Sequence, residues 1–137
     1  MSVLLRVLRG PVTDTRIETI LRCAPALFYI GLIHVVSSVP GDKLPAVIDD
    51  RLAHFVEYFG LGVVLHLAAS GFDRVGRPWT VTAAVVLFAA GYGAADEYYQ
   101  SFVPGRDSSI KDFAFDVFGA ATAALLMRWI AWRNVGG

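Results

Sequence analysis

The sequence contains few of the residues that a water-soluble domain needs. Only 18% of its 137 residues are charged, and the formal net charge is zero. The chain therefore has no basic excess with which to attract a nucleic acid. Cysteine occurs once, at Cys23. A single cysteine excludes an intrachain disulfide and any zinc site built from several thiolates.

Apolar residues take the place of the missing charge. They make up 55% of the chain and raise the mean hydropathy to +0.55. Four apolar stretches approach the roughly 20 residues that a helix needs to cross a bilayer. The sequence thus predicts an all-α, polytopic transmembrane four-helix bundle in contact with the lipid bilayer. Its spans are expected at about Ile20 to Val39, Arg51 to Ser70, Trp79 to Gln100 and Asp112 to Trp132.

The basic residues predict the orientation, because Lys and Arg close to span ends stay in the cytoplasm. Eight of the twelve basic residues and three of the twelve acids fall on one side of the four spans. The other side receives four basic residues and nine acids. Both termini are therefore predicted to be cytoplasmic. We expect residues 1–19 to form a cytoplasmic arm, residues 20–133 the transmembrane domain and residues 134–137 a short tail.

Polar side chains gather at the predicted outer ends of the spans. Ionisable groups at membrane depth are costly, so a cluster of them is by default a functional site. The helical rise places Glu57, Asp96 and Asp116 roughly 6 to 9 Å below the outer helix ends, where they can meet in one layer. Spacings of three and four residues put further polar groups on the same helical faces. The candidate site comprises His54, Glu57, Asp96, Glu97, Gln100, Arg106, Lys111, Asp112 and Asp116.

Small residues predict where the helices approach one another. Lipid supplies no hydrophobic drive for association, so close backbone packing must contribute instead. The candidate positions lie just cytoplasmic of the polar layer. They are Gly60 with Gly62, Gly91 with Gly93, and Gly119 with Ala123.

Four segments carry the most specific pattern in the chain. They are residues 37–43 (SSVPGDK), 50–62 (DRLAHFVEYFGLG), 96–106 (DEYYQSFVPGR) and 112–119 (DFAFDVFG). In combination, and above all through D-E-x-x-Q-x-x-x-P-G-R followed by D-x-x-x-[ND]-x-x-G, they resemble VanZ-like membrane proteins. Two positions depart from the pattern expected of VanZ-like proteins: Arg51 stands where a lysine is expected, and Asp116 stands where an asparagine is expected.

The resemblance implies a multi-pass protein of the prokaryotic inner or plasma membrane. VanZ-like proteins are associated with low-level resistance to teicoplanin, a lipoglycopeptide antibiotic that acts on the cell envelope. The resemblance implies neither a reaction nor a cofactor, and it leaves a homo-oligomer open. The mechanism must therefore be argued from the polar cluster.

Binding of an amphiphile is the function that the cluster favours. The planar fork of Arg106 suits a carboxylate or a phosphate, although an ion pair with Asp112 or Glu97 would equally explain an arginine in this loop. We expect the site to bind an amphiphilic ligand or a lipid headgroup, such as that of a lipid-linked cell-wall intermediate. The expected ligand-binding residues are Glu57, Gln100, Arg106, Lys111, Asp112 and Asp116.

The alternative function is a membrane-embedded hydrolase or transferase that acts on a lipid-linked cell-envelope substrate. In that case Glu97 or Asp96 would supply acid–base catalysis, supported by His54. Structural roles compete with these assignments: helix capping and loop bracing for the two acids, and a hydrogen bond to Asp96 or Asp116 for His54. Ser37, which lies shortly before Pro40, is interpreted as part of the helix end.

A metal site is not favoured by the spacing. A metal centre in a helical bundle is expected to show paired E-x-x-H elements. The chain offers one H-x-x-E element, formed by His54 and Glu57. The sequence therefore predicts no metal ligands.

Overall fold

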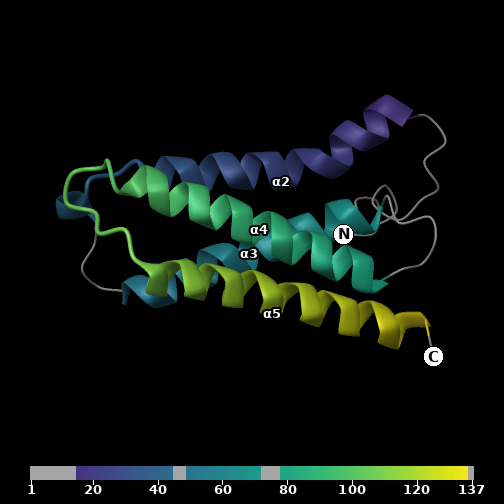
Figure 1. Cartoon of the computed structure of the whole chain (residues 1–137). Coiled ribbons are helices and arrows are strands. Elements are labelled where there is room, and N and C mark those ends of the chain that lie inside the picture. The colour runs from purple at the N-terminus through teal and green to yellow at the C-terminus, as the bar shows by residue number, and fades with distance from the viewer. Residues whose placement is uncertain (1–14, 45–48, 72–77, 136–137) are drawn as a thin grey trace.

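Four long helices make up most of the computed structural model, which describes residues 15–44, 49–71 and 78–135. Figure 1 shows them running side by side, with a short 3-10 turn, η1 (Gly41–Lys43), after the first. Within these described ranges there is no strand, which confirms the prediction of an all-α bundle. The helices are α2 (Thr15–Ser37), α3 (Asp50–Ser70), α4 (Pro78–Gln100) and α5 (Ile110–Val135).

Each long helix contains an apolar segment that can cross a membrane. These segments are Ile17–Ser37, Asp50–Ser70, Trp79–Gln100 and Ile110–Asn134. The four predicted spans are thereby confirmed to within a few residues. The largest differences concern α2, which begins at Thr15, inside the predicted arm, and α5, which begins before Asp112. Residues 1–14 of the predicted arm and residues 136–137 of the predicted tail lie outside the described residues.

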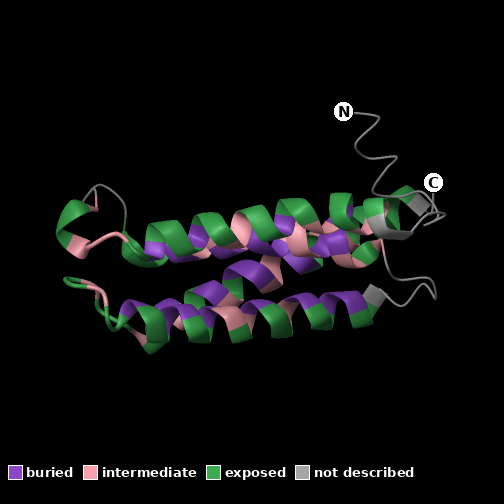
Figure 2. Ribbon diagram, turned by 90° about the horizontal axis from the view of Figure 1, so that it is seen from above, coloured by how far each residue is buried: buried purple, intermediate pink, exposed green. Residues whose placement is uncertain are grey.

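The distribution of burial suits a protein surrounded by lipid. Buried positions lie on the faces that the helices turn toward one another, and exposed positions lie outside (Figure 2). The outward faces carry large apolar side chains, including Phe28, Leu87 and Phe118. The interior in turn holds charged groups such as Asp96 and Asp116. Apolar surface of this extent is unusual on a monomer in water, whereas lipid accommodates it.

The closest packing is between α3 and α5. A Cβ atom built on Gly119 would collide with the backbone carbonyl of Phe55, and one on Gly62 would lie 2.8 Å from the carbonyl oxygen of Ala120. The predicted close approach is therefore confirmed at these two glycines. Gly91 was also predicted to lie in a contact, and this is wrong, because nothing lies within 4 Å of its Cβ direction.

Two Pro-Gly turns meet at one end of the bundle, where α2 and α4 end and α3 and α5 begin (Figure 1). The N–H of Gly41 donates to the carbonyl of Pro104 at 3.0 Å. Gly105 has φ of +73°, a conformation that favours glycine. A Cβ on Gly41 would overlap the carbonyl of Gly105, so both glycines are needed for this contact. We call this end of the molecule the polar end.

Candidate functional site

The nine predicted site residues all lie at the polar end, and they differ in how far their side chains are buried. Lys111 is exposed, while Glu57 and Arg106 are partly buried. The six others are buried, although charged and amide side chains are rarely buried without partners. These six are His54, Asp96, Glu97, Gln100, Asp112 and Asp116.

Asp96 is the centre of a hydrogen-bonded network that links α2 to α4. The hydroxyl of Ser37 donates to Asp96 Oδ2 at 2.9 Å, and the amide of Gln100 donates to the same oxygen at 2.8 Å. The amide Nε2 of Gln100 also lies 3.3 Å from the Ser37 hydroxyl. Arg106 completes the network by donating from Nε and Nη2 to Gln100 Oε1, at 3.2 and 2.8 Å. We call these four residues the Asp96 network.

A second cluster brings together α3, α4 and α5. His54 Nδ1 lies 2.8 Å from Asp116 Oδ1 and 3.8 Å from Glu97 Oε1. The other carboxylate oxygen of Glu97 accepts a hydrogen bond of 2.8 Å from the backbone N–H of Ser109, the residue that precedes α5. Glu97 therefore holds the start of α5 against the end of α4. We call His54, Glu97 and Asp116 the His54 cluster.

Among the described residues, three buried polar atoms in and beside the His54 cluster lack a hydrogen-bond partner. Glu97 Oε1, Asp116 Oδ2 and the hydroxyl of Tyr58 are buried and have no hydrogen-bond partner among the described residues. Buried polar atoms are normally paired, so each such atom calls for an explanation. The two carboxylate oxygens belong to side chains that already meet at His54.

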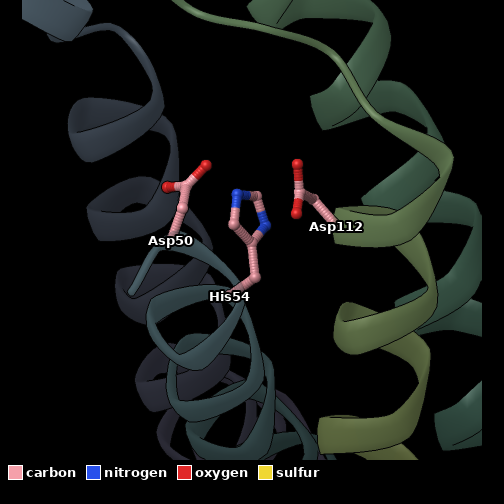
Figure 3. Close-up of side chains that lie close together, drawn as sticks. All are labelled: Asp50, His54 and Asp112. Atoms are coloured by element: carbon pink, nitrogen blue, oxygen red, sulfur yellow. The ribbon is translucent and has the colours of Figure 1, made fainter. Parts of the chain in front are cut away.

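His54 also has acids on a second side. Figure 3 shows its imidazole lying between the carboxylates of Asp50, from α3, and Asp112, from α5. One ligand atom from each of these three residues lies within 4.8 Å of the others. Asp50 is exposed and Asp112 is buried. His54 is therefore the common neighbour of four carboxylates.

The structure separates two acids that the sequence places side by side. Asp96 contacts Ser37 and Gln100, whereas Glu97 contacts Ser109 and faces His54. The two acids therefore have different hydrogen-bond partners. Of the two hydrogen bonds considered for His54, the one to Asp116 is formed.

Arg106 and Glu57 are the two partly buried residues of the site. Arg106 makes no ion pair with Asp112 or Glu97 within the described residues, and its fork is occupied by the neutral amide of Gln100. Glu57 interacts electrostatically with His54 and with Arg106, but has no hydrogen-bond partner in the described part of the chain.

Three further residues enter the site that sequence reasoning did not assign to it. Ser37 was interpreted as part of a helix end in preference to a nucleophile, and its hydroxyl joins α2 to Asp96. Tyr58 and Asp50 both lie four residues from His54 on α3, so the helical spacing could have identified them. No spacing rule could have identified Ser37, because its partner is 59 residues away.

Replacing Ser37 with alanine is expected to lower the free energy of unfolding by about 1 kcal/mol, within the range measured for hydrogen bonds between membrane helices. The measurement is unfolding in mixed micelles, followed by circular dichroism. Ser101→Ala is the matched control, because the Ser101 hydroxyl donates to the carbonyl of Tyr98 in the preceding turn and to no other helix among the described residues. Equal effects of the two substitutions would contradict a role for Ser37 in holding α2.

The candidate site lies within a region shared with a known family. Residues 27–131 match the VanZ/LLP1 family, and they include every residue of the Asp96 network and of the His54 cluster. This match covers most of the chain, which therefore belongs to the VanZ/LLP1 family. No curated protein matches the chain, and no solved structure does.

Proposed function

We propose that this VanZ/LLP1 family member binds the headgroup of an amphiphilic or lipid-linked cell-envelope molecule at its polar end, and that this end faces the outside of a prokaryotic plasma membrane. Arg106 carries the proposal. Its guanidinium is partly buried, and among the described residues both of its hydrogen bonds go to the neutral carbonyl of Gln100. An arginine held by an amide keeps its full charge, so a phosphate or carboxylate is its natural complement.

The remaining side chains supply the other half of a headgroup site. Lys111 is an exposed second cation close to Arg106 in the sequence. Glu57, Asp112 and Asp116 offer acceptors for hydroxyl or amino groups, and Gln100 is already oriented by the Asp96 network. A ligand with an anionic group and several hydroxyls therefore matches the site better than a simple anion does.

The apolar exterior suits the rest of an amphiphile. Exposed apolar side chains cover the outward helix faces along their length, so an acyl chain can lie beside the bundle while its headgroup reaches the polar end. Teicoplanin has this division into an acyl tail and a polar core, as do lipid-linked cell-wall intermediates. Either type of ligand connects the site to teicoplanin resistance.

Arg106→Gln is expected to weaken teicoplanin binding by about tenfold or more, because a charge-assisted hydrogen bond contributes about 1.5 to 3 kcal/mol. Binding is measured with the protein in lipid nanodiscs, with teicoplanin and a deacylated teicoplanin as probes. In a susceptible host, the same variant should lose any resistance that the native chain confers.

Lys43→Gln is the matched control for charge. Lys43 is an exposed cation at the polar end, and within the described part of the chain its one hydrogen bond runs from its backbone N–H to Pro40. It should bind teicoplanin as the native chain does. The proposal is contradicted if both variants bind equally, or if the deacylated and acylated probes both fail to bind the native protein.

Catalysis is the second candidate function, favoured by one contact. A buried imidazole 2.8 Å from a carboxylate is the arrangement of a general base and the group that orients it. Glu97→Gln and Arg106→Lys separate the two functions. Lost resistance with intact ligand retention favours chemistry, whereas parallel loss of resistance and retention favours recognition.

A further inference from the structure

We propose that His54, Glu97 and Asp116 form a binding site for one divalent transition-metal ion. This goes beyond headgroup binding and shares only Asp116 with the side chains proposed for that function. The three residues come from α3, α4 and α5, and they are only 3%, 6% and 0% exposed. One imidazole nitrogen and two carboxylate groups therefore meet where water has little access.

The spacing of the donor atoms is close to that of a metal site. One ligand atom from each residue lies within 4.8 Å of the other two. His54 Nδ1 lies 2.8 Å from Asp116 Oδ1 and 3.8 Å from Glu97 Oε1. Two ligands that are each about 2.1 Å from one metal lie about 3 to 3.5 Å apart in tetrahedral or octahedral geometry. Both distances from His54 Nδ1 therefore lie within an ångström of that spacing.

The unpaired oxygens are an independent indication of a missing cation. Glu97 Oε1 and Asp116 Oδ2 are buried without a hydrogen-bond partner among the described residues, and a Cβ on Gly93 would lie 3.1 Å from that Asp116 oxygen. An unpaired buried acceptor is costly, and more so when it is charged. A protonated His54 can neutralise one carboxylate, whereas a divalent ion neutralises both.

The donor set selects the class of ion. Mg²⁺ and Ca²⁺ prefer sites made of oxygen alone, while imidazole suits zinc, iron and related metals. Three protein ligands also leave a coordination position for water or for an oxygen of a bound molecule. The backbone N–H of Ser109 holds the second oxygen of Glu97 at 2.8 Å, which fixes the orientation of that ligand.

A second group, Asp50 with His54 and Asp112, is the weaker candidate. Its ligand atoms are similarly close, but Asp50 is exposed. None of its carboxylate oxygens is among the buried atoms that lack a partner. Water can therefore satisfy this group, so the buried group is the one that needs an ion.

The test is an isothermal calorimetric titration. The purified protein is first stripped of metal with a chelator and is then titrated with Zn²⁺, Mn²⁺ or Mg²⁺. We expect one Zn²⁺ or Mn²⁺ ion per chain and at least tenfold weaker binding of Mg²⁺. Glu97→Gln should weaken Zn²⁺ binding at least tenfold, because an amide oxygen is a neutral ligand. Glutamine still offers an acceptor to Ser109, and circular dichroism without metal checks that the variant folds.

Two further variants locate the ion. Asp107→Asn removes an exposed acid from the neighbouring loop and should leave the affinity for Zn²⁺ unchanged. The double change of Asp50→Asn with Asp112→Asn should weaken binding less than Glu97→Gln does. The proposal is overturned if the stripped protein binds no Zn²⁺ or Mn²⁺ stoichiometrically, or if Glu97→Gln binds as the native chain does. Teicoplanin binding in the presence of chelator tests the headgroup function separately.

Discussion

Replacing Gly119 with leucine is expected to lower the free energy of unfolding by about 3 kcal/mol or more, the upper end of the range for overpacked cores. A side chain at this position has no free space. The Cβ atom of the new side chain would collide with the backbone carbonyl of Phe55 and would lie 3.0 Å from the backbone nitrogen of Phe59. Backbone atoms cannot rotate away as a side chain does, so α3 and α5 must separate. Unfolding by detergent titration, followed by circular dichroism, measures the loss.

Gly91→Leu is the control for the effect of leucine itself. Gly91 lies in α4, also well inside a helix, but nothing lies within 4 Å of its Cβ direction. Leucine has a higher helix propensity than glycine, so this variant should be as stable as the native chain or slightly more stable. If both leucine variants unfold alike, α3 and α5 do not pack through Gly119, and the arrangement of the bundle is wrong.

The spans could be predicted from the sequence because lipid permits few alternatives. A chain that crosses a bilayer as a helix needs about 20 apolar residues, so composition alone locates the helices. Which glycine lies in a helix contact could not be predicted in the same way. Gly91 and Gly93 are two residues apart, which is about 200° around a helix, so they face different directions. The structure turns Gly93 toward Asp116 and leaves Gly91 in open space.

The sequence could also predict that the site residues gather at one end of the helices. It could not predict which side chains they would contact there. A constant rise per residue puts Asp96 and Glu97 at nearly the same level. Adjacent residues nevertheless point about 100° apart, so each meets whichever helix lies on its own side. The order of the helices around the bundle is absent from the sequence pattern. Asp96 therefore reaches Ser37 of α2, while Glu97 reaches the start of α5.

The ligands of the proposed metal site could not be predicted from spacing for the same reason. Paired E-x-x-H elements place ligands along single helices, whereas the His54 cluster takes one residue from each of three helices. A ligand set of this kind has no characteristic spacing, because the distance between its members in the sequence depends on loop lengths. The three-dimensional contacts of His54 are what motivate the metal proposal.

Replacing Asp116 with alanine is expected to lower the free energy of unfolding by about 3 kcal/mol, the lower end of the range for breaking a buried pair. The measurement is made in chelator, so that any bound metal does not contribute. Asp116 is fully buried, and its Oδ1 lies 2.8 Å from the Nδ1 of His54. Without it the imidazole loses its hydrogen-bond partner, since the nearest remaining acceptor, Glu97 Oε1, is 3.8 Å away.

Asp116→Asn separates the hydrogen bond from the charge. Asparagine keeps an acceptor for His54 in its amide oxygen and replaces the unpaired carboxylate oxygen Oδ2 with a neutral amide group. It also removes one negative charge from a region that contains Asp96 and Glu97. The variant should therefore stay within about 1 kcal/mol of the native chain, the scale of a single hydrogen bond. If asparagine destabilises the protein as much as alanine does, the carboxylate charge stabilises the bundle, and the hydrogen bond to His54 does not explain the stability of this end.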